Sequence, residues 1–311
     1  PDNGNVADYS NIAWDNPASM YSTWGYRIWQ RHIDKHQQAQ IQLGRLVKTV
    51  TNGGVFLLNT GPKGDGSISN YEKDVFLEIG KWVEDNKEAI YNTEPSPFIK
   101  LDGASCSKKD NKLYFIVTDS IEKLDCHNLV SKISKLYLLN DTNTNFTTKK
   151  IEQGVRILLP TKQPKIPYTI VAEFANDSII VEPFYITEND DHSYTLNEEN
   201  AITHSAIDGT GYMSIQLNSY KSWNVNIKEG GNYHIFVDYL PIFDQKEYVI
   251  KTKNKNLYHT FPGVDKMIQT TYVGNTSLRT GKQTIVLDAT NKCDVLEELG
   301  LENIKITLRK Y

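Results

Sequence analysis

Long apolar runs and clusters of basic residues are both missing from this chain. No stretch approaches the roughly 20 consecutive apolar residues that a membrane-spanning helix needs. The chain has 34 Lys and Arg against 38 Asp and Glu, which gives a formal net charge of −4. A nucleic-acid-binding domain usually carries a basic face, so this composition gives no electrostatic case for such a partner. We therefore expect neither a membrane span nor nucleic-acid binding.

Cysteine is also scarce, because Cys106, Cys126 and Cys293 are the three examples in 311 residues. Their spacing matches no zinc-binding motif. Isolated buried thiols are the simplest interpretation. A disulfide between Cys106 and Cys126 is the alternative, since both fall in one predicted β-domain.

The length of the chain suggests two or three domains. Its first residue is Pro1, and no signal sequence follows, which indicates an internal start or a chain that lacks its first part. Aromatic residues are plentiful, with 18 Tyr, 10 Phe and 5 Trp. Rings of this kind suit β-sheets and carbohydrate-binding surfaces alike, and sheet propensity explains most of them.

Clear helical periodicity occurs in residues 1–95. Apolar residues at intervals of three and four predict a helix over residues 35–52, which a Gly-Gly pair ends. The apolar run at residues 55–58 predicts a short strand buried on both faces. Glycines and a proline in residues 61–66 predict a turn, after which a second helical pattern begins. Helix, strand and helix in series indicate an alternating α/β fold, whose ligand sites lie in loops after the carboxyl ends of strands.

The rest of the chain has the pattern of an all-β protein. After residues 95–97, short apolar runs separated by polar turns predict strands, as in a β-sandwich. In the middle block these runs are residues 113–117, 135–139, 155–159 and 169–174. In the last block, from residue 179, they are residues 213–217, 223–227, 233–239, 248–251, 282–287 and 304–308. The sequence therefore predicts three domains, at residues 1–95, 96–178 and 179–311.

Several short motifs in the first third of the chain occur in a fixed order. They are Trp14-Asp15, Thr23-Trp24-Gly25-Tyr26, Gly53-Gly54, Leu57-Leu58-Asn59, Gly61-Pro62, Asp65-Gly66, Gly80-Lys81-Trp82 and Glu88-Ala89-Ile90-Tyr91. In this order and spacing the segment resembles the end of the catalytic barrel in α-L-fucosidases of glycoside hydrolase family 29. Two positions depart from the family pattern: Val55 replaces Asn after the Gly-Gly pair, and Asp15 replaces Glu after Trp14.

The resemblance implies a fold and an activity. The fold is multidomain α/β plus all-β: the terminal portion of a (β/α)8-type barrel, then two antiparallel β-sandwich domains. The last domain also resembles carbohydrate-binding modules, with Tyr220, Trp223, Tyr233 and Tyr239 as its aromatic supply. The implied reaction is retaining hydrolysis of terminal α-L-fucose from a fucosylated oligosaccharide or glycoconjugate, without metal or cofactor. The implied location is secreted or periplasmic, and the oligomeric state stays open.

A retaining glycosidase needs two carboxyl groups, one as nucleophile and one as acid/base. The resembled family uses an Asp nucleophile on a mid-barrel strand, and its motif is not found in this sequence. We therefore expect the nucleophile upstream of Pro1 and absent from this chain. Asp15 is the acid/base candidate because it follows Trp14; the alternative is a turn at residues 15–17, since Asp and Asn before Pro favour turns.

Trp14, Trp24 and Tyr26 are the candidates for holding the sugar, with core aromatics at the barrel rim as the alternative reading. Other polar residues have simpler interpretations. Arg27 and Arg31 are expected to form surface ion pairs. His32 and His36 are four apart and suggest a shared helix face, although a solvated pair fits better than a zinc site.

Three further polar segments contain residue types that occur in ligand-binding loops. Residues 63–66 lack the spacing of a phosphate loop, so we discount nucleotide binding. Residues 190–192 and 198–200 are acidic loops of the kind that binds calcium in sandwich modules, but they lack EF-hand spacing. Two rival functions remain: a catalytically silent barrel whose β-domains hold glycans, and a purely structural role for the β-domains.

Overall fold

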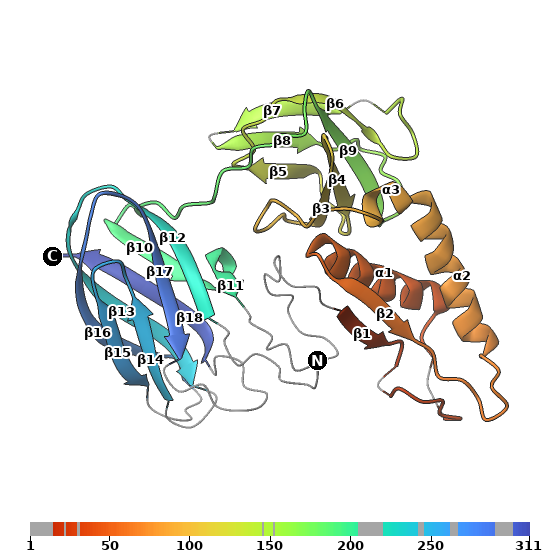
Figure 1. Ribbon diagram of the computed structural model, residues 1–311, viewed down its shortest axis with the longest axis horizontal. Helices are drawn as coiled ribbons and strands as arrows, with labels where there is room; N and C mark the ends of the chain where they lie inside the picture. The colour runs from red at the N-terminus through yellow and green to blue at the C-terminus, as the bar shows by residue number, and fades with distance from the viewer. Residues whose placement is uncertain are drawn as a thin grey trace. The chain divides into compact units, whose positions relative to one another are not determined.

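The computed structural model describes residues 15–21, 23–29, 32–144, 146–151, 153–204, 220–241, 246–261, 267–289 and 301–311. The chain divides into two compact units, Pro1–Glu182 and Pro183–Tyr311. The described part is mostly β-structure with few helices (Figure 1). Trp14, Arg31, Cys293 and the strand expected at residues 213–217 lie outside the described residues. None of the described helices is long and apolar enough to cross a membrane.

The first unit begins with a strand–helix–strand–helix segment, drawn in red to orange in Figure 1. Strand β1 (Asp15–Ser19) pairs in parallel with β2 (Val55–Asn59), and α1 (Lys35–Thr51) connects them. Helices α2 (Asn70–Asp85) and α3 (Lys87–Ile90) follow. Both predicted helices are confirmed. Parallel strands require a crossover of this kind, which explains why the helix lies between them in the sequence.

Capping residues determine where the two long helices begin. Asp34 accepts a hydrogen bond from the backbone nitrogen of Gln37 at the start of α1. Ser69 and Glu72 form a reciprocal capping box at the start of α2. At the other end of α1, Gly53 has φ +80°, a left-handed conformation that glycine adopts without strain. The turn signals in the sequence thus mark the helix ends.

The helices bury one face each against β2. Ala39, Leu43 and Val47 recur every four residues along α1 and are fully or almost fully buried. The prediction that β2 is buried on both faces is wrong for the described structure, because Val55 is 66% and Leu57 56% exposed. Leu58 packs with the helical cluster, whereas Val55 and Leu57 point to the opposite side of a two-stranded sheet.

Two antiparallel sheets complete the first unit. The first has the order β3 (Ala104–Lys109), β4 (Lys112–Val117), β9 (Tyr168–Phe174) and β6 (Ile133–Leu138). The second has the order β5 (Lys123–His127), β8 (Gly154–Leu158) and β7 (Thr147–Ile151). The four strands predicted in this block are confirmed as β4, β6, β8 and β9. The polar strands β3, β5 and β7 were missed because they lack a run of apolar residues.

The four-stranded sheet is covered on both faces. Leu113 and Phe115 of β4 share one core with Leu124 of β5 and Ile157 of β8. On the other face, Tyr114 and Ile116 pack with Val47, Ala89 and Ile90 from the helices. The strand that is buried on both faces is therefore β4. Cys106 and Cys126 lie in the first of these cores as free thiols, and burial raises the pKa of both well above the ordinary value.

The second unit consists of two antiparallel sheets around one core. One has the order β10 (Ser193–Asn197), β18 (Leu301–Lys310), β13 (Gly231–Pro241) and β16 (Gln269–Leu278). The other has the order β11 (Ile202–His204), β12 (Tyr220–Ile227), β17 (Gly281–Ala289), β14 (Lys246–Lys251) and β15 (Asn256–Phe261). A 3-10 turn, η1 (Glu198–Asn200), follows β10.

Large aromatic side chains fill the core of the second unit. Trp223, Tyr233 and Tyr239 have no exposed surface. The expectation that they supply a sugar-binding surface is therefore wrong: their strand positions place them between the sheets. Alternate positions of the same strand point outward, so His234 and Phe236 lie on the opposite face.

Candidate functional site

The carboxyl ends of the parallel strands β1 and β2 lie at one edge of their sheet, and a loop follows each strand there. Strand β1 ends at Ser19 and β2 at Asn59, which are partners in the register. The described parts of the loops are residues 20–21, 23–29 and 32–34 after β1, and residues 60–69 after β2. In α/β folds this edge is where ligand sites are built. The contacts that hold the two loops together therefore determine the geometry of this edge.

Asn59 and Gly61 fix the position of the Trp24–Tyr26 backbone. The Asn59 side-chain amide donates a hydrogen bond to the carbonyl oxygen of Trp24 at 2.7 Å. A Cβ atom at Gly61 would lie 2.8 Å from the backbone nitrogen of Tyr26, closer than any real side chain comes. Glycine is therefore required at position 61 for the two loops to approach each other.

Glu72 is the anchor of the second loop, and the side chain is 1% exposed. One carboxylate oxygen accepts from the backbone nitrogen of Gly61 at 3.1 Å and from the Thr60 hydroxyl at 3.2 Å. The other accepts from the hydroxyl of Ser69 at 2.8 Å and from its backbone nitrogen at 3.3 Å. Both ends of the loop are thus tied to one buried carboxylate. The sequence analysis missed Glu72, although the capping-box spacing of Ser69 and Glu72 is a signal that could have indicated it.

Aromatic side chains and His32 pack beside this loop. The hydroxyl of Tyr21 lies 3.3 Å from Nδ1 of His32, whose ring packs against that of Tyr71 in a tilted arrangement with a centroid distance of 4.1 Å. Burial raises the pKa of Tyr21, and the Glu72 carboxylate adds to that shift. The phenol is therefore a neutral hydrogen-bonding group at neutral pH.

His32 and His36 do not share a helix face. His32 precedes α1, which begins at Lys35, whereas His36 lies in the first turn and pairs with Glu78. In the described residues, no group of three His, Cys, Asp or Glu side chains gathers as a metal site. Arg27 lies over the ring of Trp29, at 5.6 Å from its centroid, and forms no ion pair within the part of the chain that the structure describes.

Trp24 and Tyr26 lie at the carboxyl edge of the β1–β2 pair, whereas Asp15 lies at its amino edge. Trp24 is 47% and Tyr26 41% exposed, so both have ring surface available to a ligand. Asp15 is exposed and is the first residue of β1, paired with Val55 at the amino end of β2. The turn expected at residues 15–17 is wrong, because these residues form a strand in register with β2.

The polar segments of the sequence have local partners. Gly66 donates its backbone hydrogen to the carbonyl of Lys63 at 2.8 Å, and Asp65 accepts from the backbone of Ser67 at 2.9 Å. The side-chain and backbone hydrogen bonds of Ser67 lower the pKa of the Asp65 carboxyl. Residues 63–66 therefore form a closed turn. In the second unit, Asn197 and Asn200 cap η1.

Comparison with known proteins identifies the first part of the chain. Residues 1–88 match the family model described as alpha-L-fucosidase. The alpha-L-fucosidase of Dictyostelium discoideum is 40% identical over 82 residues, which are 26% of this chain and 18% of that protein. The human tissue alpha-L-fucosidase is 41% identical over 73 residues, which are 24% of this chain and 16% of that protein.

The first part of the chain is similar to α-L-fucosidases. The resemblance to glycoside hydrolase family 29 is thereby confirmed, although the match spans less than a fifth of the length of these curated relatives. The structural similarity extends over more of the chain than the sequence similarity does. The crystal structure of an alpha-L-fucosidase from Vibrio sp. strain EJY3 covers 96% of this chain with a TM-score of 0.56, at 17% identity and over 55% of its own length.

Proposed function

We propose that the protein is a retaining glycoside hydrolase that removes terminal α-L-fucose from fucosylated oligosaccharides or glycoconjugates. The observation that carries the proposal is the Trp24–Tyr26 segment, which Asn59 and Gly61 hold at the carboxyl edge of β2. This segment lies within the α-L-fucosidase match. Exposed rings fixed on a rigid edge suit a sugar, whose apolar ring face stacks on aromatic surface while its hydroxyls find polar partners.

The proposed fold is the end of a (β/α)8-type barrel followed by two β-sandwich domains, divided at residues 95 and 178. The parallel pair β1 and β2 with its crossover helix supports the barrel. The exposed side chains of Val55 and Leu57 also support the barrel, because in a closed barrel the apolar side chains that point inward fill the interior. Pairs of antiparallel sheets around one core each support the sandwiches.

In this proposal Trp24 and Tyr26, with Trp14, contact the substrate, and no cofactor takes part. The nucleophile is not among the 311 residues, and the intact enzyme includes the barrel strands that carry it. Asp15 as acid/base rests on the resemblance, whereas its exposed position at the amino edge of β1 favours a role outside the reaction. A secreted or periplasmic location belongs to the same proposal.

The test is hydrolysis of an aryl α-L-fucoside by the intact protein. Tyr26→Ala removes an exposed ring from the proposed sugar site, and we expect kcat/KM to fall about tenfold or more. Tyr91→Ala is the matched control, because Tyr91 is also exposed but lies outside the two loops. Equal activity of the two variants would show that the Trp24–Tyr26 segment is not part of the substrate site. No hydrolysis by the intact protein would reject the proposed function.

A catalytically silent glycan-binding protein is the second candidate. The observation that favours it is a polar groove in the second unit, whose chemistry suits a sugar and is independent of the barrel.

A further inference from the structure

A groove of about 630 Å³ runs along the outward face of the second unit's four-stranded sheet. Its lining is polar: Ser193 and Thr195 from β10, Lys305, Thr307 and Arg309 from β18, and the loop 189–191. Strand alternation explains this composition. Ile304, Ile306 and Leu308 of β18 are buried in the core, so the residues between them point outward.

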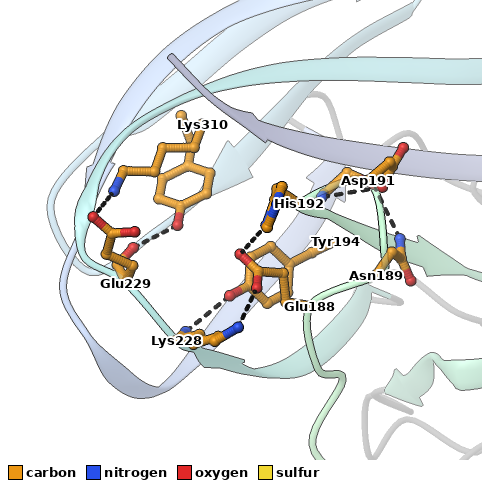
Figure 2. Close-up of polar contacts among 10 residues, drawn as sticks. Glu188, Asn189, Asp191, His192, Tyr194, Lys228, Glu229 and Lys310 are labelled. Carbon is orange, nitrogen blue, oxygen red and sulfur yellow. Dashed lines mark hydrogen bonds and ion pairs between the residues drawn. The ribbon is translucent and has the colours of Figure 1, made fainter.

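The loop that forms one wall of the groove is fixed by its own hydrogen bonds (Figure 2). Asp191 accepts from the backbone nitrogen and hydroxyl of Ser193 at 3.1 and 2.5 Å. The side-chain amide of Asn189 donates to the hydroxyls of Ser193 and Thr195, both at 3.0 Å. Because these bonds are made between residues of the protein itself, binding in the groove does not have to order the loop.

A second set of contacts ties the same loop to the neighbouring turn. Glu188 lies 3.6 Å from the His192 ring and 3.1 Å from the Lys228 ammonium (Figure 2). The Tyr194 hydroxyl accepts a hydrogen bond from the backbone nitrogen of Lys228 at 2.8 Å. The wall of the groove is therefore anchored on both sides.

The charges around the groove balance. Asp190 and Asp191 oppose Lys305 and Arg309, and Lys305 lies 3.7 Å from Asp238. Neither the Asp190 carboxylate nor the Arg309 guanidinium has a hydrogen bond or ion pair within the described ranges. Such a balance selects against strongly ionic ligands. The Asp190 carboxylate as acceptor and the Arg309 guanidinium as donor, both lining the groove, suit hydroxyl groups, which donate and accept at once.

Aromatic rings lie next to Arg309 on the same outward face of the four-stranded sheet. The guanidinium lies 5.7 Å from the ring centroid of Phe236, and Phe236 lies 5.4 Å from Tyr272. His234 stacks on Tyr311 at 4.0 Å. Tyr272 is 47% and Tyr311 62% exposed. A polar groove that borders exposed rings offers both kinds of contact that a sugar uses.

We propose that this groove and its ring border bind a neutral oligosaccharide. Asp190, Thr307 and Arg309 hydrogen-bond sugar hydroxyls, and Tyr272 or Tyr311 stacks on an adjacent sugar ring. The ligand class rests on the proposed function, since it treats the protein as one that acts on glycans. The site itself is separate from the loops of the first unit.

The test is titration of the 311-residue chain with neutral oligosaccharides, with and without fucose, by nuclear magnetic resonance. We expect a dissociation constant in the millimolar to high micromolar range. Arg309→Ala and Tyr272→Ala should each weaken binding about tenfold. Arg279→Ala and Tyr258→Ala are matched controls on exposed positions away from the groove and should leave binding unchanged.

Tyr311→Ala, at the last residue, tests the ring border with the least effect on folding, and circular dichroism checks each variant. No binding across the panel, or equal binding by groove variants and controls, overturns the inference. Aryl-fucoside hydrolysis by the intact protein tests the proposed function independently of sugar binding in the groove. Hydrolysis without sugar binding by the chain rejects only the groove, and Arg309-dependent binding without hydrolysis rejects only the enzyme.

Discussion

At the carboxyl edge of β2, the side-chain amide of Asn59 and the lack of a side chain at Gly61 determine where the Trp24–Tyr26 backbone lies. Asn59 supplies the hydrogen bond, and Gly61 supplies the space. Both are part of the motifs that resemble the α-L-fucosidases, so the structure gives a physical reason for those residue types. The rings of Trp24 and Tyr26 do not have to form the contact that positions them, which leaves their faces free for a sugar.

Asp15 gives a prediction at the same scale. If it is the acid/base, Asp15→Ala in the intact protein should slow hydrolysis of natural glycans about a hundredfold or more. Aryl fucosides should be affected much less, because their leaving groups need little protonation. The measurement is kcat/KM on both substrate types, with Asp34→Ala as a control, since Asp34 caps α1.

Equal losses on the two substrates would assign Asp15 a role in strand β1 rather than in proton transfer. The exposed position of Asp15 at the amino end of β1 makes this comparison decisive.

At the scale of elements, the loop between β2 and α2 depends on Glu72. Glu72→Ala removes the partner of the Gly61 backbone nitrogen and of the Ser69 cap. Lost capping costs about 0.5–2 kcal/mol and an unsatisfied buried donor about 1–3 kcal/mol, so we expect unfolding to become easier by about 2–4 kcal/mol. Glu84→Ala on the same helix is the control, because its side chain is 72% exposed and pairs only locally with Lys87.

Thermal unfolding followed by circular dichroism measures the difference between these variants. A Glu72→Ala melting temperature equal to that of Glu84→Ala would mean that the loop is held by other contacts.

The elements also show what the sequence was able to predict. Helices α1 and α2 and the apolar strands were found because their periodicity reflects burial on one or both faces. Strands β3, β5 and β10 were missed, since their outward side chains are polar and their pairing depends on distant partners. The burial of β2 was overestimated for a related reason: its apolar run fits a closed sheet, but the described sheet has two strands.

The candidate site was predictable in part. Turn signals placed residues 61–66 at the ligand edge, and the resemblance selected Trp24 and Tyr26. The number of tyrosines in the second unit did not show which of them face outward. Tyr233 is fully buried and Tyr272 is 47% exposed, because their positions in the strand register differ. Register is set by the whole sheet, so the outward ring border was visible only in the structure.

At the scale of the whole molecule, the question is whether these 311 residues contain a complete catalytic pair. A retaining glycosidase places its two carboxyl groups about 5–5.5 Å apart. At the carboxyl edge, the carboxylates belong to Asp34 and Asp65 in the two loops and to Glu72 in the first turn of α2. Each already accepts a backbone hydrogen bond, from Gln37 at 3.1 Å, Ser67 at 2.9 Å and Gly61 at 3.1 Å respectively.

Carboxylates engaged in caps and turns are held away from a substrate, so this edge offers no free pair. We therefore expect the 311-residue chain alone to release no nitrophenol from an aryl α-L-fucoside above a heat-treated control, whereas the intact protein does. The chain should still be folded, which circular dichroism verifies in the same sample. Release well above the control would mean that the nucleophile lies within these residues. Replacing each carboxylate of the chain in turn would then identify it by the variant that loses the activity.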